Sequence, residues 1–237
     1  MNIELGAPTA YPTNVSYRIG RVARYIYGGR WLDYGCADGG YTASLLDAGA
    51  VNVVGVDISP ERIETARTTH PGVEFRVNND GLLSFKDRAF DGAFLNEVIE
   101  HVADESRTLS DIGRVLKPDG ILIIIAPNRG FPFEGHRIHM GQWTSAWPFP
   151  IVPWLPRRLT DNWVTARNYW PHEIVEIVKS NGFDIIESGF IMPTFEGFQW
   201  IPEKLAQMFR RHITTIDRNY SVKPCPPQAF SAGFRQR

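Results

Sequence analysis

Two carboxylates and an imidazole stand close together in the segment NEVIEH, residues 96–101. If the chain turns helical at Glu97, then Glu97, Glu100 and His101 fall at positions i, i+3 and i+4, on one face of the helix. Together they form a ligand set for a divalent cation, and the carboxylate oxygens favour Mg²⁺ or Mn²⁺. Such an ion lowers the pKa of a hydroxyl group bound to it. In the alternative interpretation no metal binds, Glu100 is structural, and His101 acts as a base or simply packs.

A second stretch with chemical potential covers residues 31–57, WLDYGCADGGYTASLLDAGAVNVVGVD. It reads as strand, glycine-rich turn, helix, strand and acid, the plan of a nucleotide-binding βαβ unit. Glycines let the backbone pass close to a ligand, and Asp57 is placed to accept hydrogen bonds from two ribose hydroxyls. Asp33 and Asp38 flank the turn; their charge repels a pyrophosphate but suits a sulfonium and an α-amino group. The turn therefore favours S-adenosylmethionine (SAM) over NAD, and an ordinary turn without a ligand is the plain alternative.

The elements that must position these residues alternate along the chain, which predicts a doubly wound α/β sheet. Ser59 and Pro60 are typical of an N-cap and a first helical residue. The β-branched run at 121–126 indicates a strand buried on both faces. The sequence predicts helices at 15–27, 41–48, 60–69, 105–116, 171–180 and 203–213, and strands at 31–33, 53–56, 73–77, 89–95, 121–126, 183–188 and 228–234.

Residues 127–170 interrupt this alternation. The segment holds five of the seven tryptophans and six prolines. A long irregular stretch in a compact domain is usually functional or disordered, and so many aromatic residues argue against disorder. We expect either a packed cap over the sheet edge or a lid that forms an acceptor pocket, and the two interpretations are compatible.

The composition is that of a soluble globular protein, with 43% hydrophobic and 22% charged residues among 237. We expect a single domain over 1–237, with an N-terminal helix or cap at 1–27, the insertion at 127–170 and a C-terminal helical addition at 193–228. A net charge of −1 disfavours a nucleic-acid partner. The two cysteines indicate a reducing compartment, the cytoplasm, and no apolar run approaches the length of a membrane span. The oligomeric state stays open.

The chain resembles a class I SAM-dependent methyltransferase of the methyltransferase type 11 group over about residues 28–190. LDYGCADGG resembles the first motif of that family, VVGVDIS the ribose motif, NNDGL the adenine loop and VLKPDGILIIIAPN the turn and fifth strand. The resemblance implies a Rossmann-like sheet of seven strands, the last antiparallel, with SAM as cofactor. The residues that it implies for the cofactor are Asp33, Gly35, Cys36, Gly39, Asp57, Ile58, Asp80, Gly81 and Asn96. Many members carry glycine at the position of Ala37, and we expect one methyl group there to change little.

The segment EVIEH also resembles metal-dependent O-methyltransferases. One group of these acts on catechol-type quinone precursors, and the other on the terminal ribose 2′-hydroxyl of small RNAs. The second group takes a further histidine from the segment after strand five, where this chain offers His136 and His139. The candidate catalytic residues are Glu97, Glu100 and His101, and the candidate metal ligands are these three with His136 and His139.

These observations together predict a SAM-dependent methyltransferase whose acceptor is a hydroxyl of a small molecule, such as a sugar, a glycolipid precursor, a quinol or a natural product. The aromatic insertion suits stacking on a ring face of the acceptor. An N- or C-methyltransferase of the same fold and a non-catalytic SAM-binding protein are the alternatives. The glycine spacing disfavours an NAD-dependent oxidoreductase.

Overall fold

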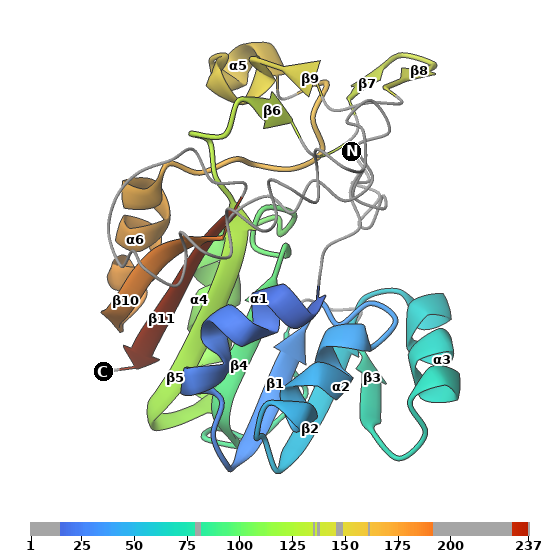
Figure 1. Ribbon diagram of the computed structural model, residues 1–237, viewed down its shortest axis with the longest axis vertical. Helices are drawn as coiled ribbons and strands as arrows, with labels where there is room; N and C mark the ends of the chain where they lie inside the picture. Colours follow the sequence, from blue (N-terminus) through green and yellow to red (C-terminus); the bar gives the residue numbers. More distant parts are fainter. Residues whose placement is uncertain are drawn as a thin grey trace.

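The computed structural model describes residues 15–78, 82–134, 136, 138–145, 149–160, 162–191 and 229–236. Helices and strands alternate along the described chain, and the predicted doubly wound α/β fold is confirmed (Figure 1). The predicted helix at 203–213 and the loop that carries Asp80 and Gly81 lie outside the described residues.

The described helices have the following bounds. They are α1 (Val15–Val22), α2 (Gly40–Asp47), α3 (Pro60–Thr69), α4 (Glu105–Val115), α5 (Arg157–Thr160) and α6 (Pro171–Ser180), with 3₁₀ turns η1 (Ala23–Tyr25) and η2 (Val152–Trp154). None of these helices is long and apolar enough to cross a membrane. The predicted cap of α3 is confirmed, because the Arg62 N–H donates to the Ser59 hydroxyl and Pro60 opens the helix.

The strands fall into one main sheet and two small hairpin-like pairs. The main sheet contains β1 (Arg30–Tyr34), β2 (Asn52–Asp57), β3 (Glu74–Val77), β4 (Phe90–Asn96), β5 (Leu116–Pro127), β10 (Phe183–Ile191) and β11 (Ala229–Gln236). The insertion adds β6 (Phe133–Glu134), β7 (His139–Met140), β8 (Trp143–Thr144) and β9 (Phe149–Pro150). In the insertion β6 pairs with β9, and β7 pairs with β8.

Five parallel strands form the centre of the main sheet, in the order β5-β4-β1-β2-β3. Beyond β5, β11 pairs antiparallel with both β5 and β10. The strand order reverses between β1 and β4, and ligands of open α/β sheets bind at the carboxyl ends of the strands beside such a reversal. Figure 1 shows the insertion above this edge. The glycine-rich turn after β1 and the acidic segment after β4 are therefore neighbours.

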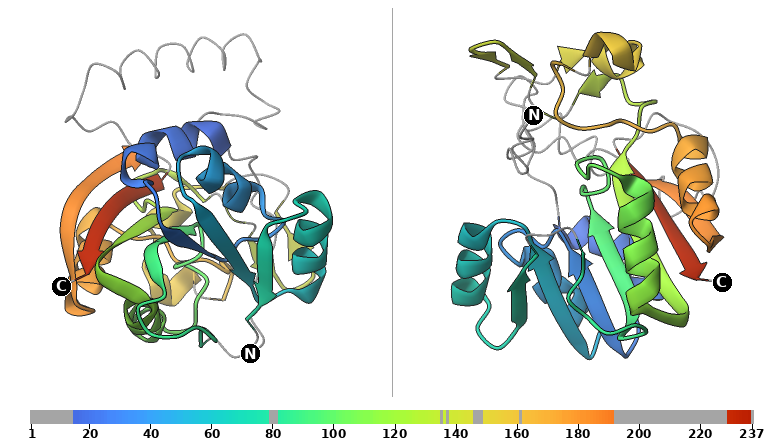
Figure 2. Two further views of the ribbon diagram at one scale, coloured as in Figure 1. Left: turned by 90° about the horizontal axis from the view of Figure 1, so that it is seen from below. Right: turned by 180° about the vertical axis from the view of Figure 1, so that it is seen from behind.

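Helices cover both faces of the sheet. The described clusters of buried side chains place α1 and α2 on one face and α4 and α6 on the other (Figure 2). Leu122 and Ile124 of β5 belong to the cluster of α4, whereas Ile123 and Ile125 belong to that of α1. The predicted burial of this strand on both faces is confirmed.

Strand β5 begins earlier than predicted. It starts at Leu116 rather than at residue 121, and residues 117–120 form an irregularity within it. Phe90 of β4 pairs with Leu116 and Gly92 with Ile121, so four residues of β5 stand outside the register. The turn signal of the KPDG segment is thus accommodated as a bulge inside a strand, with Asp119 at φ 64°.

The glycine-rich turn has backbone angles that explain its composition. Gly35 lies at φ 80° and Gly39 at φ 87°, the left-handed region that favours glycine. A Cβ on Gly35 would lie 2.4 Å from the Val98 side chain, and one on Gly39 would lie 2.7 Å from the Phe75 ring. These glycines make room for the Val98 and Phe75 side chains, and their predicted approach to a ligand stays a prediction.

Ala37 lies at φ 49° within the same turn. Because a left-handed conformation costs an L-residue with a Cβ about 1–2 kcal/mol, we now expect the methyl group of Ala37 to lower stability. We predict that Ala37→Gly stabilises the fold by about 1 kcal/mol and raises the melting temperature by about 2–4 °C. Thermal unfolding of the purified variant measures this.

The matched control is Ala43→Gly, inside helix α2. There glycine only adds backbone entropy to the unfolded chain, and we expect a loss of about 1 kcal/mol. Equal melting temperatures for wild type and Ala37→Gly would contradict the strain at Ala37.

Candidate active site

Asp57 ends β2 and holds the glycine-rich turn. Its Oδ2 accepts a hydrogen bond of 3.0 Å from the Ala37 N–H, and its Oδ1 accepts one of 2.9 Å from the Ser59 N–H. A carboxylate oxygen can accept two hydrogen bonds, so with respect to the described residues each oxygen keeps one acceptor position. Ile58, the next residue, is exposed. The arrangement leaves an acceptor pair and an apolar side chain at the carboxyl end of β2, which fits a ribose and an adjoining base.

Asp33 lies deeper, near the end of β1. Only 2% of it is exposed, and its Oδ2 accepts a 2.6 Å hydrogen bond from the Thr42 hydroxyl of α2. Burial raises the pKa of Asp33 to about 7, and the hydrogen bond from Thr42 partly offsets this effect. Cys36 is also buried, in the cluster of Phe75, and burial raises the pKa of its thiol.

The segment after β4 is a turn rather than the helix that the one-face argument required. Glu97 adopts φ 55°, and its carboxylate accepts a 2.9 Å hydrogen bond from buried Arg18 of α1. The same guanidinium nitrogen donates to the Asn96 side-chain oxygen at 2.8 Å. Arg18 therefore engages Asn96, the last residue of β4, and Glu97, the residue after it. Glu97 is not part of the ligand group that contains Glu100 and His101.

That group is completed by a residue from the insertion. Glu100, His101 and His136 each offer a ligand atom within 4.8 Å of the others. The Glu100 Oε1 lies 4.0 Å from Nε2 of His101 and 4.0 Å from Nε2 of His136. His139, the other candidate, lies on β7, and its Nδ1 is 3.0 Å from the Thr144 hydroxyl. Of the two histidines that the sequence left open, the structure thus brings His136 beside Glu100 and His101.

Glu134 orients His136 and was not predicted. Its Oε1 lies 3.0 Å from Nδ1 of His136 and accepts from the backbone N–H of the same residue at 2.9 Å. Its Oε2 accepts a 2.6 Å hydrogen bond from the Asn168 amide. A carboxylate that accepts a hydrogen bond from Nδ1 leaves Nε2 as the nitrogen that can bind a ligand. Such a carboxylate is the usual support of a metal-bound histidine. The Glu-x-His spacing was the only sequence signal for this pair.

The protonation states of the cluster follow from burial and mutual charge. Burial and then the charge of Glu97 raise the pKa of Glu100 well above its ordinary value. Burial and the neighbouring His136 lower the pKa of His101 to about 4, so His101 is a neutral imidazole at physiological pH. A group with so low a pKa is a weak general base, whereas a neutral imidazole is the form that binds a metal.

Buried polar atoms without a hydrogen-bond partner among the described residues show whether a cation fits between Glu100, His101 and His136. Among the described residues, both carboxylate oxygens of Glu100 and Nε2 of His136 are buried and have no hydrogen-bond partner. Buried polar atoms are normally paired, and three unpaired ones that converge on the same point require an explanation. A divalent cation held by Glu100, His101 and His136 supplies one.

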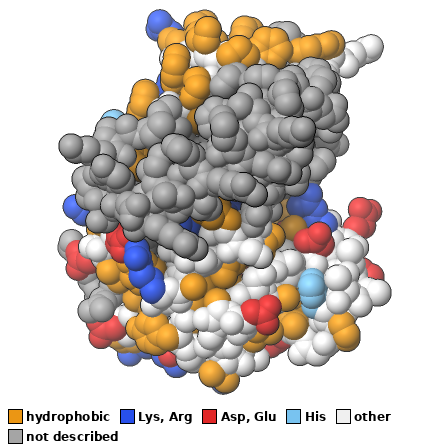
Figure 3. All heavy atoms as spheres, in the orientation of Figure 1, with side chains coloured by type: hydrophobic (Ala, Val, Ile, Leu, Met, Phe, Trp, Pro, Cys, Tyr) orange, Lys and Arg blue, Asp and Glu red, His pale blue; other side chains and the backbone are white. Residues whose placement is uncertain are grey.

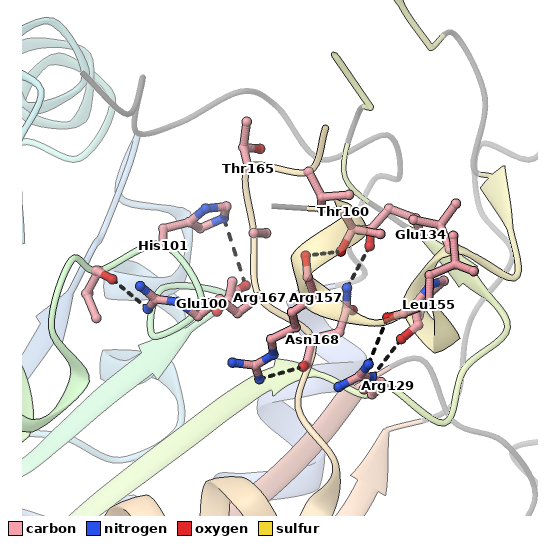
Figure 4. Close-up of a pocket in the computed structure, with 15 residues that line it drawn as sticks. Glu100, His101, Arg129, Glu134, Leu155, Arg157, Thr160, Thr165, Arg167 and Asn168 are labelled. Carbon is pink, nitrogen blue, oxygen red and sulfur yellow. Dashed lines mark hydrogen bonds and ion pairs between the residues drawn. The ribbon is translucent and has the colours of Figure 1, made fainter. Parts of the chain in front are cut away.

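A pocket of about 330 Å³ opens on this cluster (Figure 4). Glu100 and His101 form one part of its lining, and the insertion supplies most of the rest. The apolar part of the lining consists of Val102, Val152, Pro153, Leu155, Val164 and Ala166.

The described tryptophans of the insertion do not line this pocket. Trp143, Trp154, Trp163 and Trp170 are each between 37% and 50% exposed. Figure 3 shows hydrophobic side chains gathered on the outer face of the insertion. The apolar lining of this pocket is therefore aliphatic, and stacking of an acceptor ring on the aromatic insertion stays a prediction.

Comparison with known proteins gives a family for the core of the chain. Residues 32–124 match the methyltransferase domain family. A probable S-adenosylmethionine-dependent methyltransferase of Mycolicibacterium smegmatis is 33% identical over 109 residues, which cover 46% of this chain and 42% of the relative. A ubiquinone biosynthesis O-methyltransferase of Bartonella bacilliformis is 28% identical over 160 residues, which cover 66% and 60%.

The fold has close counterparts among solved structures. A crystal structure of an S-adenosylmethionine-dependent methyltransferase from Mesorhizobium loti is similar with a TM-score of 0.62 and 18% identity, over 92% of this chain and 97% of that chain. Residues 32–124 thus resemble the methyltransferase domain family, and the described chain has the fold of class I SAM-dependent methyltransferases; the predicted resemblance is confirmed. It spans only 42% and 60% of the two curated relatives.

The buried carboxyl group of Asp33 predicts a pH dependence of stability. A carboxyl whose pKa is raised to about 7 on folding stabilises the folded state below its unfolded pKa of about 4, and this contribution is lost as the pH rises through 7. We predict that the wild type loses more stability between pH 5 and pH 8 than Asp33→Asn does, by about 2–3 kcal/mol. Urea unfolding at both pH values measures the difference.

Asp47→Asn is the control, because Asp47 is exposed at the end of α2. Its stability should follow that of the wild type at both pH values. Parallel curves for wild type and Asp33→Asn would show that Asp33 is ionised in the folded protein throughout this range.

Proposed function

We propose that this protein is a SAM-dependent methyltransferase that methylates a hydroxyl group of a small molecule. The observation that carries the proposal is the cluster of Glu100, His101 and His136, which opens on a small pocket at the carboxyl edge of a methyltransferase sheet. A relative named as a ubiquinone biosynthesis O-methyltransferase supports transfer to oxygen. A volume of about 330 Å³ suits a small acceptor rather than a macromolecule.

The cofactor half of the site follows from the turn after β1 and the end of β2. When bound, SAM supplies a methyl group on a positively charged sulfur. In our proposal Asp57 receives the ribose hydroxyls at its two remaining acceptor positions, and exposed Ile58 lies against the adenine. The predicted roles of Asp33, Gly35, Cys36, Gly39, Asn96, Asp80 and Gly81 toward the same cofactor belong to this proposal.

The acceptor half uses the cluster after β4. We propose that Glu100, His101 and His136 hold a divalent cation, with Glu134 fixing the ring of His136. Our proposal leaves out Glu97, which pairs with Arg18, and His139, which contacts Thr144, because neither belongs to this group of ligand atoms. Two imidazoles and one carboxylate suit Mn²⁺ or another transition metal better than Mg²⁺. The bound cation would lower the pKa of the acceptor hydroxyl.

The remaining architectural proposals concern the whole chain. We propose a single domain in which residues 127–170 form the acceptor side of the site, supported by the pocket lining that this insertion provides. The backbone pairing of β11 with β5 and β10 supports a seven-stranded sheet with an antiparallel last strand.

SAM binding tests the cofactor half. We predict that SAM and S-adenosylhomocysteine raise the melting temperature of the wild type, that NAD does not, and that Asp57→Asn weakens SAM binding about ten- to hundredfold because it loses charge-assisted hydrogen bonds. Calorimetric titration measures the affinity. The control is Asp47→Asn, an exposed acid outside the site, which should bind SAM like the wild type. Absence of SAM binding to the folded wild type would overturn the proposed function.

Metal removal tests the acceptor half. We predict that the metal-free protein binds Mn²⁺ more tightly than Mg²⁺ and that Glu134→Gln lowers Mn²⁺ affinity about ten- to hundredfold, because supports of metal ligands contribute that much. The matched control is Glu176→Gln on the exposed face of α6. Methyl transfer at full rate in EDTA, or equal Mn²⁺ affinity in Glu134→Gln and Glu176→Gln, would overturn the proposed metal site. Neither result would overturn the proposed methyltransferase activity.

A further inference from the structure

The pocket beside the cluster carries more positive charge than the proposed chemistry requires. Arg129, Arg157 and Arg167 all line it, and they come from three separate stretches of the insertion (Figure 4). The carboxylates that line the same pocket are Glu100 and Glu134. Glu134 is committed to His136 and Asn168, and Glu100 faces the two histidines.

The three arginines differ in how their charge is compensated. Arg167 is ion-paired with Glu105 at 2.8 Å and also donates to the Val102 carbonyl oxygen, so its charge is neutralised locally. Arg129 donates to the carbonyl oxygens of Pro153 and Leu155 at 2.8 and 2.9 Å. These oxygens are neutral, and no ion pair links Arg129 to a carboxylate within the described ranges of the chain. Arg129 therefore leaves a positive charge in the wall of the pocket.

Arg157 is the arginine that is freest to meet a ligand. Its nearest carboxylate is Glu173, at 3.7 Å, and the two side chains are 44% and 32% exposed. Exposed pairs of this length contribute little and exchange readily with a better partner. Its hydrogen bond to the Asn168 carbonyl oxygen is long, at 3.3 Å, and its guanidinium lies 5.7 Å from the Tyr169 ring centroid. The Tyr169 ring thus supports the guanidinium while its donors stay available.

We propose that the methyl acceptor carries an anionic group, a carboxylate or a phosphate, which binds Arg157 in the field of Arg129 while the acceptor hydroxyl faces Glu100 and His101. The aliphatic side chains Val152, Pro153 and Leu155 line the same pocket and suit the ring or chain that joins the two polar groups. Guanidinium is the side chain best matched to both anions, because its planar donors engage two oxygens at once. This inference deepens the proposed function and rests on it for the identity of the pocket as the acceptor site.

Small isosteric probes test the anion site without any turnover. Benzoate, phenyl phosphate and neutral benzamide are titrated into the full chain at fixed ionic strength, with binding followed by calorimetry or ligand-observed NMR. We expect at least one of the two anions to bind about tenfold more tightly than benzamide, as a charge-assisted hydrogen bond predicts. The tighter anion identifies whether the group is a carboxylate or a phosphate.

Arg158→Gln provides a matched control, because Arg158 is the exposed neighbour of Arg157 on α5 and is not part of the pocket lining. In Arg157→Gln the preference for anions should fall to less than about threefold, whereas Arg158→Gln should keep it and Arg157→Lys should keep part of it. Arg157→Lys also tests the site if Arg157→Gln fails to fold. Equal binding of all three probes to the wild type, or an equal effect of the two glutamine variants, would overturn the inference.

SAM titration of the same samples separates this inference from the proposed function. An intact anion preference in a protein that does not bind SAM would leave the anion site standing and overturn the methyltransferase. SAM binding without any preference for anions would overturn the anion site and leave the proposed methyltransferase standing.

Discussion

The candidate active site depends on one constraint. The carboxyl group of Glu100 is buried and has no hydrogen-bond partner in the described part of the chain. Glu100 is 2% exposed, and neither of its side-chain oxygens is satisfied among the described residues. An unpaired buried carboxylate is strongly unfavourable, so the group must either hold a proton or meet a cation. The nearby buried cation, Arg18, donates to Asn96 and Glu97. In the proposed function, a metal ion takes the place of that proton on Glu100.

Three segments that are distant in sequence come together at this site. The sheet brings the turn after β1 beside the segment after β4, because the strand order reverses between them. The insertion then adds His136 from above, and Glu134 and Asn168 fix its ring. A cofactor that donates a methyl group and a hydroxyl that accepts it need such convergence, since in-line transfer requires both to be held in one orientation. Packing, rather than any single residue, provides that orientation.

The insertion has two unlike faces. Its inner face supplies aliphatic side chains and arginines to the pocket, and its outer face exposes Trp143, Trp154 and Trp163. A composition rich in aromatic residues suggested that rings would line the acceptor site. The choice of face depends on which side chains η2, α5 and residues 164–168 turn toward the pocket. Such short and irregular segments have no periodicity from which this choice can be derived.

The sequence by itself determined the α/β fold, the cofactor turn and the acid at the end of β2, because apolar runs, glycines and caps act through local backbone preferences. It also identified Glu100 and His101 as candidates through their spacing. Only the tertiary structure decided that His136 lies beside them and that Arg18 pairs with Glu97. It also revealed the orientation of His136 by Glu134 and the placement of Arg157 in the pocket. These contacts join residues from separate elements, and their partners are set by long-range packing, which local sequence patterns do not encode.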